Sequence, residues 1–503
     1  MDGGKYYFCF SPGVFFASGL VYSYKLLEYS VMAVIITYLT SSSEQINLTK
    51  ASVIVNTKDL ISATSVIVLT FISNTFIGRP KVITCSAIFT SAGLVMLYFI
   101  AHAEESDEIE RRILFKIIGV FVTAVGEAGV MALLGDFIAD QLRAREPKTN
   151  KNEDRVEARK TVWWRGSWCF SVITSFLIRY YSWADTFSFS AKATVITLIF
   201  FVGGTAWLHY CGKSAPAGSH NYYSHDVYFY QSRRPRLTDQ AKVREPSTLR
   251  PQGQDMEGRL HSGKIFLNMI PMGSSFLVYG LVVSTEETFF PEQGDEMQLS
   301  SFFTILFVFQ SVSSKSISYL FSYFLDSEWV PVDKRKQAKL VRIWFGMVLT
   351  IFCCFVAERV EVHRLIVVNK EGFLDKPDQI IPMSIFWLAP QYCLLGLTKG
   401  IAEEGLDEFL IDNFPISWKG YVSAITKFVI GIGNLLSIIS VHAYGSLFAD
   451  TLNRSRLDEY YKRITIFSFV NMCYYWCIYI FYTKYHTANV VGDDIVPKLS
   501  IFP

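Results

Sequence analysis

The stretch that decides the fold is ILFKIIGVFVTAVGEAGVMALLGDFIADQ, residues 113–141, in which apolar side chains predominate and charged ones are few. A helix needs about 20 such residues to cross a hydrocarbon core roughly 30 Å thick. In lipid the backbone N–H and C=O groups must also be paired within the segment, and a helix pairs them. Residues 113–141 therefore predict a membrane-spanning helix that is long enough to tilt or to protrude into water.

Eleven other stretches have the same character. Together with the first, the predicted spans are 12–40, 52–76, 82–103, 113–141, 161–183, 190–211, 263–290, 299–326, 337–358, 382–412, 418–445 and 457–485. Composition agrees, because 51% of the residues are apolar and 18% are charged, whereas a soluble domain carries about 25% charged residues. The sequence predicts an all-α membrane protein with about twelve transmembrane helices.

A polar segment, residues 212–262, separates the sixth span from the seventh and is rich in Pro, Ser, Gln and Arg. It predicts a cytosolic linker between an N-terminal half, residues 1–211, and a C-terminal half, residues 263–503, with six helices each. Two such halves around a midplane site are typical of alternating-access carriers. A membrane enzyme would need convergent nucleophile, His or Asp motifs near one face, and the sequence has none. We therefore expect no enzyme, no cofactor and no metal site.

The charges of the loops predict the orientation. The loop after the fourth span, residues 142–160, is rich in Arg and Lys, and residues 104–110 after the third span are rich in Asp and Glu. Basic loops stay in the cytosol, so both termini should be cytosolic, and plasma, vacuolar and vesicle membranes all remain open. The formal net charge of +2 argues against a nucleic-acid partner, so we expect a monomer in the lipid bilayer that binds a small solute, with or without protons. Sequons at Asn47 and Asn453 would lie on the outer side, where they could be glycosylated.

Several motifs are more specific than these patterns. They are Phe76-Ile77-Gly78-Arg79, Ala139-Asp140-Gln141, Phe386-Trp387-Leu388-Ala389-Pro390-Gln391-Tyr392, Glu408-Phe409 followed by Asp412, and Gly431-Ile432-Gly433-Asn434-Leu435-Leu436-Ser437. With these motifs in order along nearly the whole chain, the sequence resembles the plant nitrate/peptide transporter family. That family is a branch of the proton-dependent oligopeptide transporters in the major facilitator superfamily. The resemblance implies the major facilitator fold and symport of a solute with protons.

The resemblance also implies roles for particular residues. Gating or structural roles fall on Arg79, Asp140, Glu408, Asp412 and Asn74, the last of which stands where many facilitators have an aspartate. The asparagine can still form hydrogen bonds, but it is neutral.

The first helix departs from the family. The family's Glu-x-x-Glu-Arg/Lys motif, which is tied to proton coupling, falls on Val21-Tyr22-Ser23-Tyr24-Lys25. Lys25 keeps the basic residue and both carboxylates are absent, which puts proton coupling in question. Glu28 lies one turn from Lys25, so the two could form a local structural ion pair or a group linked to solute or protons. Tyr24 could line the path and stack on an organic solute.

Two more family positions have changed charge. The fourth-span lysine falls on Met131, and the tenth-span glutamate falls on Lys399. An unpaired ammonium in the membrane would be costly, so we expect a carboxylate beside Lys399. The candidates on the tenth and seventh spans are Glu403, Glu404, Glu286 and Glu287. Such groups could bind the solute, or they could form a charge pair that locks one end of the bundle.

The leading hypothesis is a secondary carrier of a small polar solute such as nitrate, a peptide or an amino-acid-like compound. Because Lys399 and the carboxylates offer both signs of charge, a zwitterion is favoured. A histidine that binds nitrate in some relatives would fall at Val283, and its absence disfavours nitrate by that route. Two alternatives stay open: a proton-independent facilitative or efflux carrier, and a sensor that binds a solute without moving it.

Overall fold

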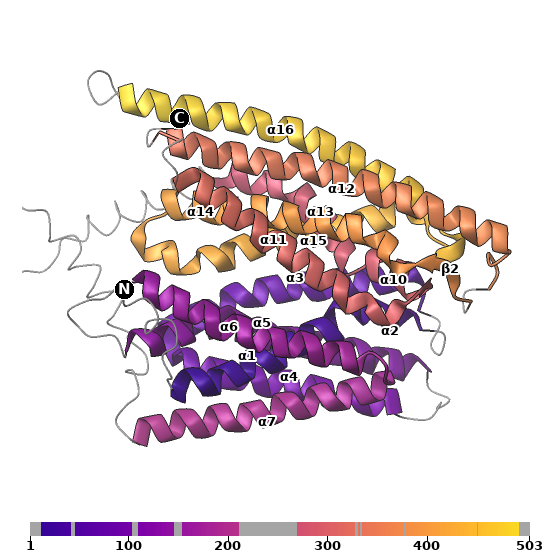
Figure 1. Ribbon diagram of the computed structural model, residues 1–503, viewed down its shortest axis with the longest axis horizontal. Coiled ribbons are helices and arrows are strands. Elements are labelled where there is room, and N and C mark those ends of the chain that lie inside the picture. Colours follow the sequence, from indigo (N-terminus) through magenta and orange to yellow (C-terminus); the bar gives the residue numbers. More distant parts are fainter. Residues whose placement is uncertain are drawn as a thin grey trace, which may run out of the picture.

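The computed structural model describes residues 12–41, 46–102, 109–144, 153–210, 269–326, 330–331, 334–376, 379–449 and 451–491. Nearly all of this part of the chain is helical, and long helices run side by side along the long axis of the molecule (Figure 1). Helices from the N-terminal part, indigo to magenta, lie on one side, and those from the C-terminal part, orange to yellow, lie on the other. The predicted all-α architecture is confirmed. The linker at 212–262 lies outside the described residues, so the division of the chain there stays a prediction.

The described residues of the N-terminal part form seven α-helices. They are α1 (Pro12–Ser30), α2 (Ile35–Thr40), α3 (Leu48–Ile72), α4 (Arg79–His102), α5 (Ile109–Arg143), α6 (Glu153–Ile178) and α7 (Trp183–Tyr210). A short 3-10 turn, η2 (Met32–Val34), joins α1 to α2, and the π-helical η3 (Ser73–Ile77) extends α3. That extension ends at Gly78, whose φ of 85° is readily adopted by glycine.

The C-terminal part begins with helical residues 269–283. Then follow η4 (Ser284–Glu286), α10 (Phe289–Asp295), β1 (Met297–Gln298), η5 (Ser300–Phe302), α11 (Phe303–Asp326), α12 (Arg335–Glu371), β2 (Ile381–Ser384), η7 (Ile385–Leu388), α13 (Ala389–Thr398), η8 (Lys399–Glu403), α14 (Glu404–Asn413), η9 (Ile416–Tyr421), α15 (Val422–Ala443), η10 (Gly445–Leu447), η11 (Leu452–Arg454) and α16 (Leu457–Val491). The two short strands pair in parallel and tie the end of α10 to the segment before α13.

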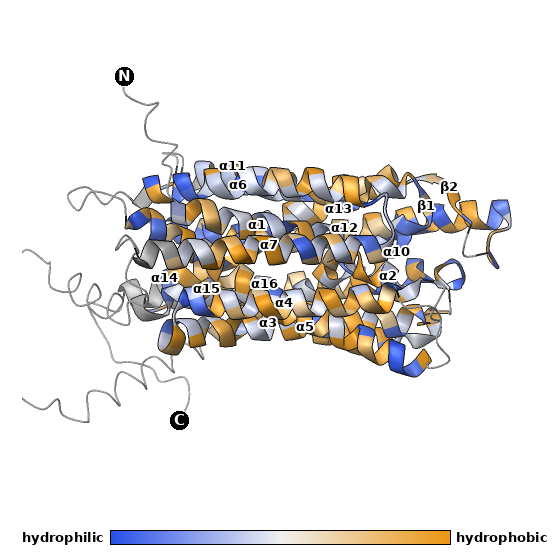
Figure 2. Ribbon diagram, turned by 90° about the horizontal axis from the view of Figure 1, so that it is seen from below, coloured by the Kyte–Doolittle hydropathy of each residue, from blue (hydrophilic) through white to orange (hydrophobic). Residues whose placement is uncertain are grey.

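These elements group into twelve helical rods across the described ranges, because short breaks interrupt the first, seventh and tenth. Eight rods are long and apolar enough to cross a membrane. Hydrophobic residues run along the lengths of the helices (Figure 2). The other four rods contribute side chains to the cavity described below. They are the rods that contain α6, residues 269–283, α11 and α13. The twelve-helix count is therefore consistent with the sequence prediction.

The boundary between the fifth and sixth spans differs from the prediction. The structure ends α6 at Ile178 and begins α7 at Trp183, whereas the sequence predicted one span to residue 183 and the next from residue 190. Ser182 explains the early start of α7. Its Oγ accepts a hydrogen bond from the backbone N–H of Asp185 (3.2 Å) and donates one to the Asp185 carboxylate (2.7 Å). The first of these bonds caps a free backbone N–H group at the helix start.

The ninth span is also longer than predicted. α12 continues to Glu371, beyond the predicted end at residue 358, and stops at Gly372 with a φ of 69°. A glycine in this conformation is a common helix terminator. Two charged residues beyond the predicted end, Glu361 and Arg364, are fully buried and paired with each other.

Glycines let α15 approach two neighbours closely. A Cβ on Gly433 would lie 2.5 Å from the Cα of Gly280, in helical residues 269–283. A Cβ on Gly431 would lie 2.3 Å from the Cβ of Ala63, in α3. Small residues at both crossings therefore set the spacing between α15 and the helices on either side of it.

We expect Gly433→Ala to destabilise the folded protein by about 1–3 kcal/mol, because the added methyl group overlaps the backbone of the neighbouring helix. The melting temperature of the purified protein measures this effect. Gly445→Ala is the control, since no atom lies within 4 Å of a Cβ placed there. Equal melting temperatures for the two variants would contradict the prediction.

Candidate solute-binding cavity

A cavity of about 810 Å³ lies between α1 and α6 of the N-terminal part and α11, η4 and η8 of the C-terminal part. Its charged and tyrosine lining residues are Lys25, Glu28, Tyr29, Glu157, Lys160, Arg165, Glu286, Glu287, Lys315, Tyr319 and Lys399. Pockets for small molecules usually measure roughly 300–1,000 Å³. The cavity is therefore large enough for a small organic solute and presents both signs of charge.

Lys399 and Glu286 form an ion pair on the cavity wall. The Glu286 side chain is 11% exposed and the Lys399 side chain 25% exposed. Gln310 of α11 donates a hydrogen bond from Nε2 to Glu286 Oε1 (2.7 Å), so both carboxylate oxygens have a partner. Of the four carboxylates that the sequence offered to Lys399, the structure places Glu286 against it.

Helix breaks place both members of this pair. Glu286 ends the 3-10 turn η4, which interrupts the seventh rod, and Lys399 begins the π-helical η8, which separates α13 from α14. A π-helical turn widens the backbone locally and is frequent at functional sites. The main-chain carbonyl of Gly400 in this turn accepts a hydrogen bond from Arg342 Nη2 (2.7 Å).

On α1, Lys25 and Glu28 form an ion pair across one helical turn, and both line the cavity. Tyr29, the next residue, joins three helices. Its hydroxyl accepts a hydrogen bond from Trp168 Nε1 of α6 (2.9 Å) and contacts Ser311 Oγ of α11 (3.2 Å). Sequence reasoning missed Tyr29 because neither its spacing nor the family motif marks it.

Three predicted candidates lie elsewhere. Tyr24 is fully buried, and its hydroxyl donates to Thr90 Oγ1 of α4 (3.0 Å), away from the cavity lining. Glu403 accepts a hydrogen bond from Tyr279 (2.9 Å). Glu404 pairs with Lys315 (2.9 Å), which lines the cavity. The structure therefore gives these groups contact partners other than Lys399, although Glu403 still interacts with Lys399 electrostatically.

Three charged residues that the sequence analysis did not select lie beside the cavity. Lys58 and Asp59 of α3 contact each other at 2.8 Å, and Lys58 also contacts Glu287. Glu127 of α5 lies within the electrostatic reach of Lys58, Glu287 and the Lys25–Glu28 pair. The signal was present in the sequence, because an ionisable residue inside an apolar span is a functional candidate by default.

The predicted gating residues form ion pairs at one end of the bundle. Arg79 contacts Asp140 and also Asp136 (3.4 Å). Arg342, on α12, contacts Glu408 (2.7 Å), and Lys339 contacts Asp412 (2.7 Å). Asn74 lies in η3, directly before the turn that leads to Arg79.

The opposite end of the bundle is held by contacts between the N-terminal and C-terminal parts. Thr40, at the end of α2, donates a hydrogen bond to Glu292 of α10 (3.0 Å). Arg179, after α6, lies 4.0 Å from Asp295. Because the cavity lining reaches Glu157 near the start of α6, the cavity extends toward the end that is distant from these contacts.

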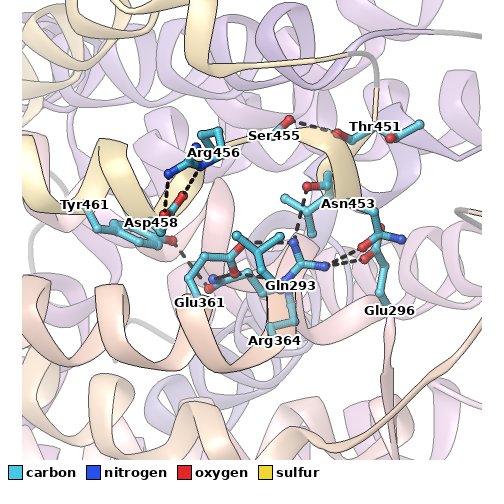
Figure 3. A network of polar contacts seen from close by, with 12 residues as sticks. Gln293, Glu296, Glu361, Arg364, Thr451, Asn453, Ser455, Arg456, Asp458 and Tyr461 are labelled. Carbon is cyan, nitrogen blue, oxygen red and sulfur yellow. Dashed lines mark hydrogen bonds and ion pairs between the residues drawn. The ribbon is translucent and has the colours of Figure 1, made fainter. Parts of the chain in front are cut away.

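A second polar network, largely buried, lies at the end of α12 (Figure 3). Arg364 Nε and Nη2 donate to the two carboxylate oxygens of Glu361 (2.9 and 2.8 Å). Its Nη1 donates to Glu296 (2.8 Å) and to Asn453 (2.6 Å), and Nη2 also donates to the Leu452 carbonyl (3.2 Å). Five hydrogen bonds therefore satisfy the five N–H donors of a guanidinium group.

Asn453 belongs to this network, which changes the interpretation of its sequon. The side chain is 1% exposed, and its Nδ2 donates to the Phe373 carbonyl (3.5 Å) while Oδ1 accepts from Arg364. A glycan needs an exposed amide nitrogen. The expectation that this sequon could be glycosylated on the surface is therefore wrong for the folded protein, because the buried network occupies the amide.

A bundle of twelve helices with a charged cavity between its N-terminal and C-terminal parts is the architecture of a membrane transporter. The model of the POT family matches residues 80–449, so the chain belongs to the POT family. Two similar relatives are proteins of Arabidopsis thaliana. NRT1/PTR FAMILY 5.10 is 26% identical over 512 residues, covering 92% of this chain and 90% of that protein. NRT1/PTR FAMILY 5.5 is 26% identical over 493 residues, covering 89% of this chain and 92% of that protein.

Solved structures show the same fold. A mutant POT peptide transporter in complex with alafosfalin superposes with a TM-score of 0.63 at 10% identity, covering 93% of this chain and 94% of that one. A POT family transporter in complex with 5-aminolevulinic acid gives a TM-score of 0.58 at 11% identity, covering 92% and 96%. The major facilitator fold is thus confirmed, and the protein is an integral, multi-pass membrane protein whose family and structural neighbours are transporters.

Proposed function

We propose that this protein is a secondary carrier that moves a small zwitterionic solute, amino-acid-like or peptide-like, by alternating access. The observation that supports this is the Lys399–Glu286 pair on the wall of the cavity, with the Lys25–Glu28 pair on the same lining. A solute carboxylate would take the place of a glutamate at an ammonium group, and a solute amine would take the place of a lysine at a carboxylate. Each exchange replaces one charged contact by another, so no charge is left unpaired in the cavity.

The ligands of structural neighbours are compatible with this solute class. The name 5-aminolevulinic acid denotes a compound with an amino group and a carboxylic acid, and the transporter that binds it has the same fold as this chain. The cavity, about 810 Å³, is large enough for a solute of that size.

The remaining features of the proposal follow from the sequence. The carrier would work as a monomer with both termini in the cytosol, and residues 212–262 would link its two halves. The ion pairs of Arg79 with Asp140 and of Arg342 with Glu408 would hold the cytosolic ends of helices. Symport with protons is implied by the family, and its alternative is a facilitative or efflux carrier that ignores the proton gradient.

The test is uptake of a solute panel into proteoliposomes, with and without an inward proton gradient, by the wild-type protein and by Lys399→Ala. The panel contains nitrate, dialanine, amino-acid-like chelators and plant hormones. Loss of one hydrogen bond to a charged group costs about 1.5–3 kcal/mol, so we expect uptake of the zwitterions at low concentration to fall roughly 10–100-fold. Lys462→Ala is a matched control because that lysine is 58% exposed on α16.

The outcomes separate the alternatives. Uptake that needs the gradient and falls in Lys399→Ala supports a proton-coupled carrier of a zwitterion. Uptake that is indifferent to the gradient supports the facilitative carrier. Binding of dialanine without uptake, measured by a shift of the melting temperature, would support a sensor and contradict the proposal.

A further inference from the structure

Lys58 and Asp59 place two charges in the middle of α3, inside a span that is otherwise apolar. The Lys58 side chain is only 4% exposed. Its Nζ lies 2.8 Å from Asp59 Oδ1 and also contacts the carboxylate of Glu287, which follows η4 in the C-terminal part of the chain. One ammonium group therefore joins two carboxyl groups that come from the two parts of the bundle.

Because Lys58 Nζ contacts an oxygen of each, the two carboxyl groups lie against one ammonium group. If both are ionised, the three side chains carry a net charge of −1. Two carboxylates held close together repel each other, and binding of one proton relieves that repulsion. With Lys58 charged, the group of three is electrically neutral when it holds one proton.

The charges around Asp59 and Glu287 do not neutralise the group of three in place of that proton. The ionisable groups that act on the pair are Lys58 itself, Glu127 of α5 and Lys399 of η8. Lys399 is already paired with Glu286. The other elements that pack on α3 add little: α15 has no charged residue between Lys427 and His442, and Tyr38 is the one ionisable residue of α2.

We propose that the Asp59–Glu287 carboxyl pair, bridged by Lys58, is the proton-binding site of this carrier. This inference rests on the proposed function, and it names the group that couples protons to transport. A proton that enters the cavity binds to a carboxylate oxygen of the pair and thereby holds α3 against Glu287. When the two parts separate and water reaches both carboxylates, the proton leaves to that water and Lys58 stays charged.

Solute and proton would meet at adjacent residues. Glu286 takes part in the solute site and Glu287 takes part in the proton site, and Lys399 acts electrostatically on both. A solute carboxylate that engages Lys399 would weaken its effect on Glu287 and favour the protonated pair. The coupling therefore needs no carboxylate on the first helix, where the family motif has lost both.

The direct test is infrared spectroscopy of the purified protein in lipid at neutral pH, with no solute added. A protonated carboxyl group gives a C=O absorption that a carboxylate lacks. We expect the wild-type protein to show this absorption. In Asp59→Asn, and likewise in Glu287→Gln, the absorption should fall by the contribution of one carboxyl group. Asp375→Asn, which changes an exposed aspartate, should match the wild type. An undiminished absorption in both variants would overturn the proposal.

The functional test uses dialanine in proteoliposomes. One coupled proton allows about tenfold accumulation per unit of pH gradient. The measured quantity is the ratio of two values: the dialanine accumulated under a gradient of one pH unit, and the dialanine exchanged at equal pH. We expect this ratio to fall about tenfold in Asp59→Asn and to stay unchanged in Asp375→Asn. An unchanged ratio in Asp59→Asn would overturn the coupling role. If wild-type protein neither exchanges nor accumulates dialanine, the zwitterion proposal fails, and the infrared result still decides whether the carboxyl pair holds a proton.

Discussion

Arg364→Gln should destabilise the protein by about 3–5 kcal/mol, because it removes one partner of a buried ion pair and leaves the other charge uncompensated. Glu361 is fully buried and receives hydrogen bonds from Arg364 and from Gln293 Nε2 (2.5 Å). With Arg364 absent, Glu361 would keep the glutamine donor but lose its positive counter-charge. Glu296 and Asn453 would each lose a donor as well.

The melting temperature and the yield of folded protein in detergent measure this loss. Arg359→Gln is the matched control, since Arg359 lies on the same helix, is 63% exposed and contacts Glu358 at 3.9 Å. A surface ion pair of that kind contributes about 0–1 kcal/mol. Equal melting temperatures for the two variants would show that the buried network does not hold the end of α12.

A second variant separates the loss of charge balance from the loss of packing. The double substitution Glu361→Gln with Arg364→Gln removes both charges together, so it should be less destabilising than Arg364→Gln alone. If the loss in the double variant equals the sum of the losses measured separately in Arg364→Gln and Glu361→Gln, the two residues do not act as a pair.

The helices themselves could be predicted from the sequence, because the bilayer imposes a length and a polarity that any spanning helix must meet. Their ends could not be predicted as well. α12 runs past residue 358 because Glu361 and Arg364 neutralise each other inside the protein. A hydropathy pattern counts both as polar and cannot show that they pair.

The candidate site was predicted in part. Lys399 was expected to need a carboxylate, and the structure puts Glu286 beside it. The sequence did not show which of the four glutamates would lie beside Lys399. That choice depends on η4 and η8, because each break rotates the side chains that follow it relative to a regular helix. Lys58 could not be found from the family motifs, because none of the quoted motifs falls within α3.

The Lys399–Glu286 pair can be a structural lock or a solute contact, and a double-mutant cycle distinguishes the two roles. Either Lys399→Ala or Glu286→Gln alone leaves a partly buried group without its partner, so we expect each to lower stability by about 1–3 kcal/mol. The double variant should recover part of that loss, with a coupling energy of about 0.5–3 kcal/mol between the two sites. The melting temperatures of the four proteins give this energy.

Uptake of dialanine by the same four proteins then assigns the role. If the pair is only a lock, uptake should return in the double variant together with stability. If Lys399 and Glu286 contact the solute, uptake should stay low in the double variant although its stability has returned, because the charged contacts to the solute are still missing. The pair of Arg454 with Asp375 provides the control cycle, since its side chains are 56% and 68% exposed and a surface pair contributes little. We expect the solute-contact result, because the cavity reaches both residues of the Lys399–Glu286 pair, whereas the ion pair of Arg342 with Glu408 lies outside the cavity lining.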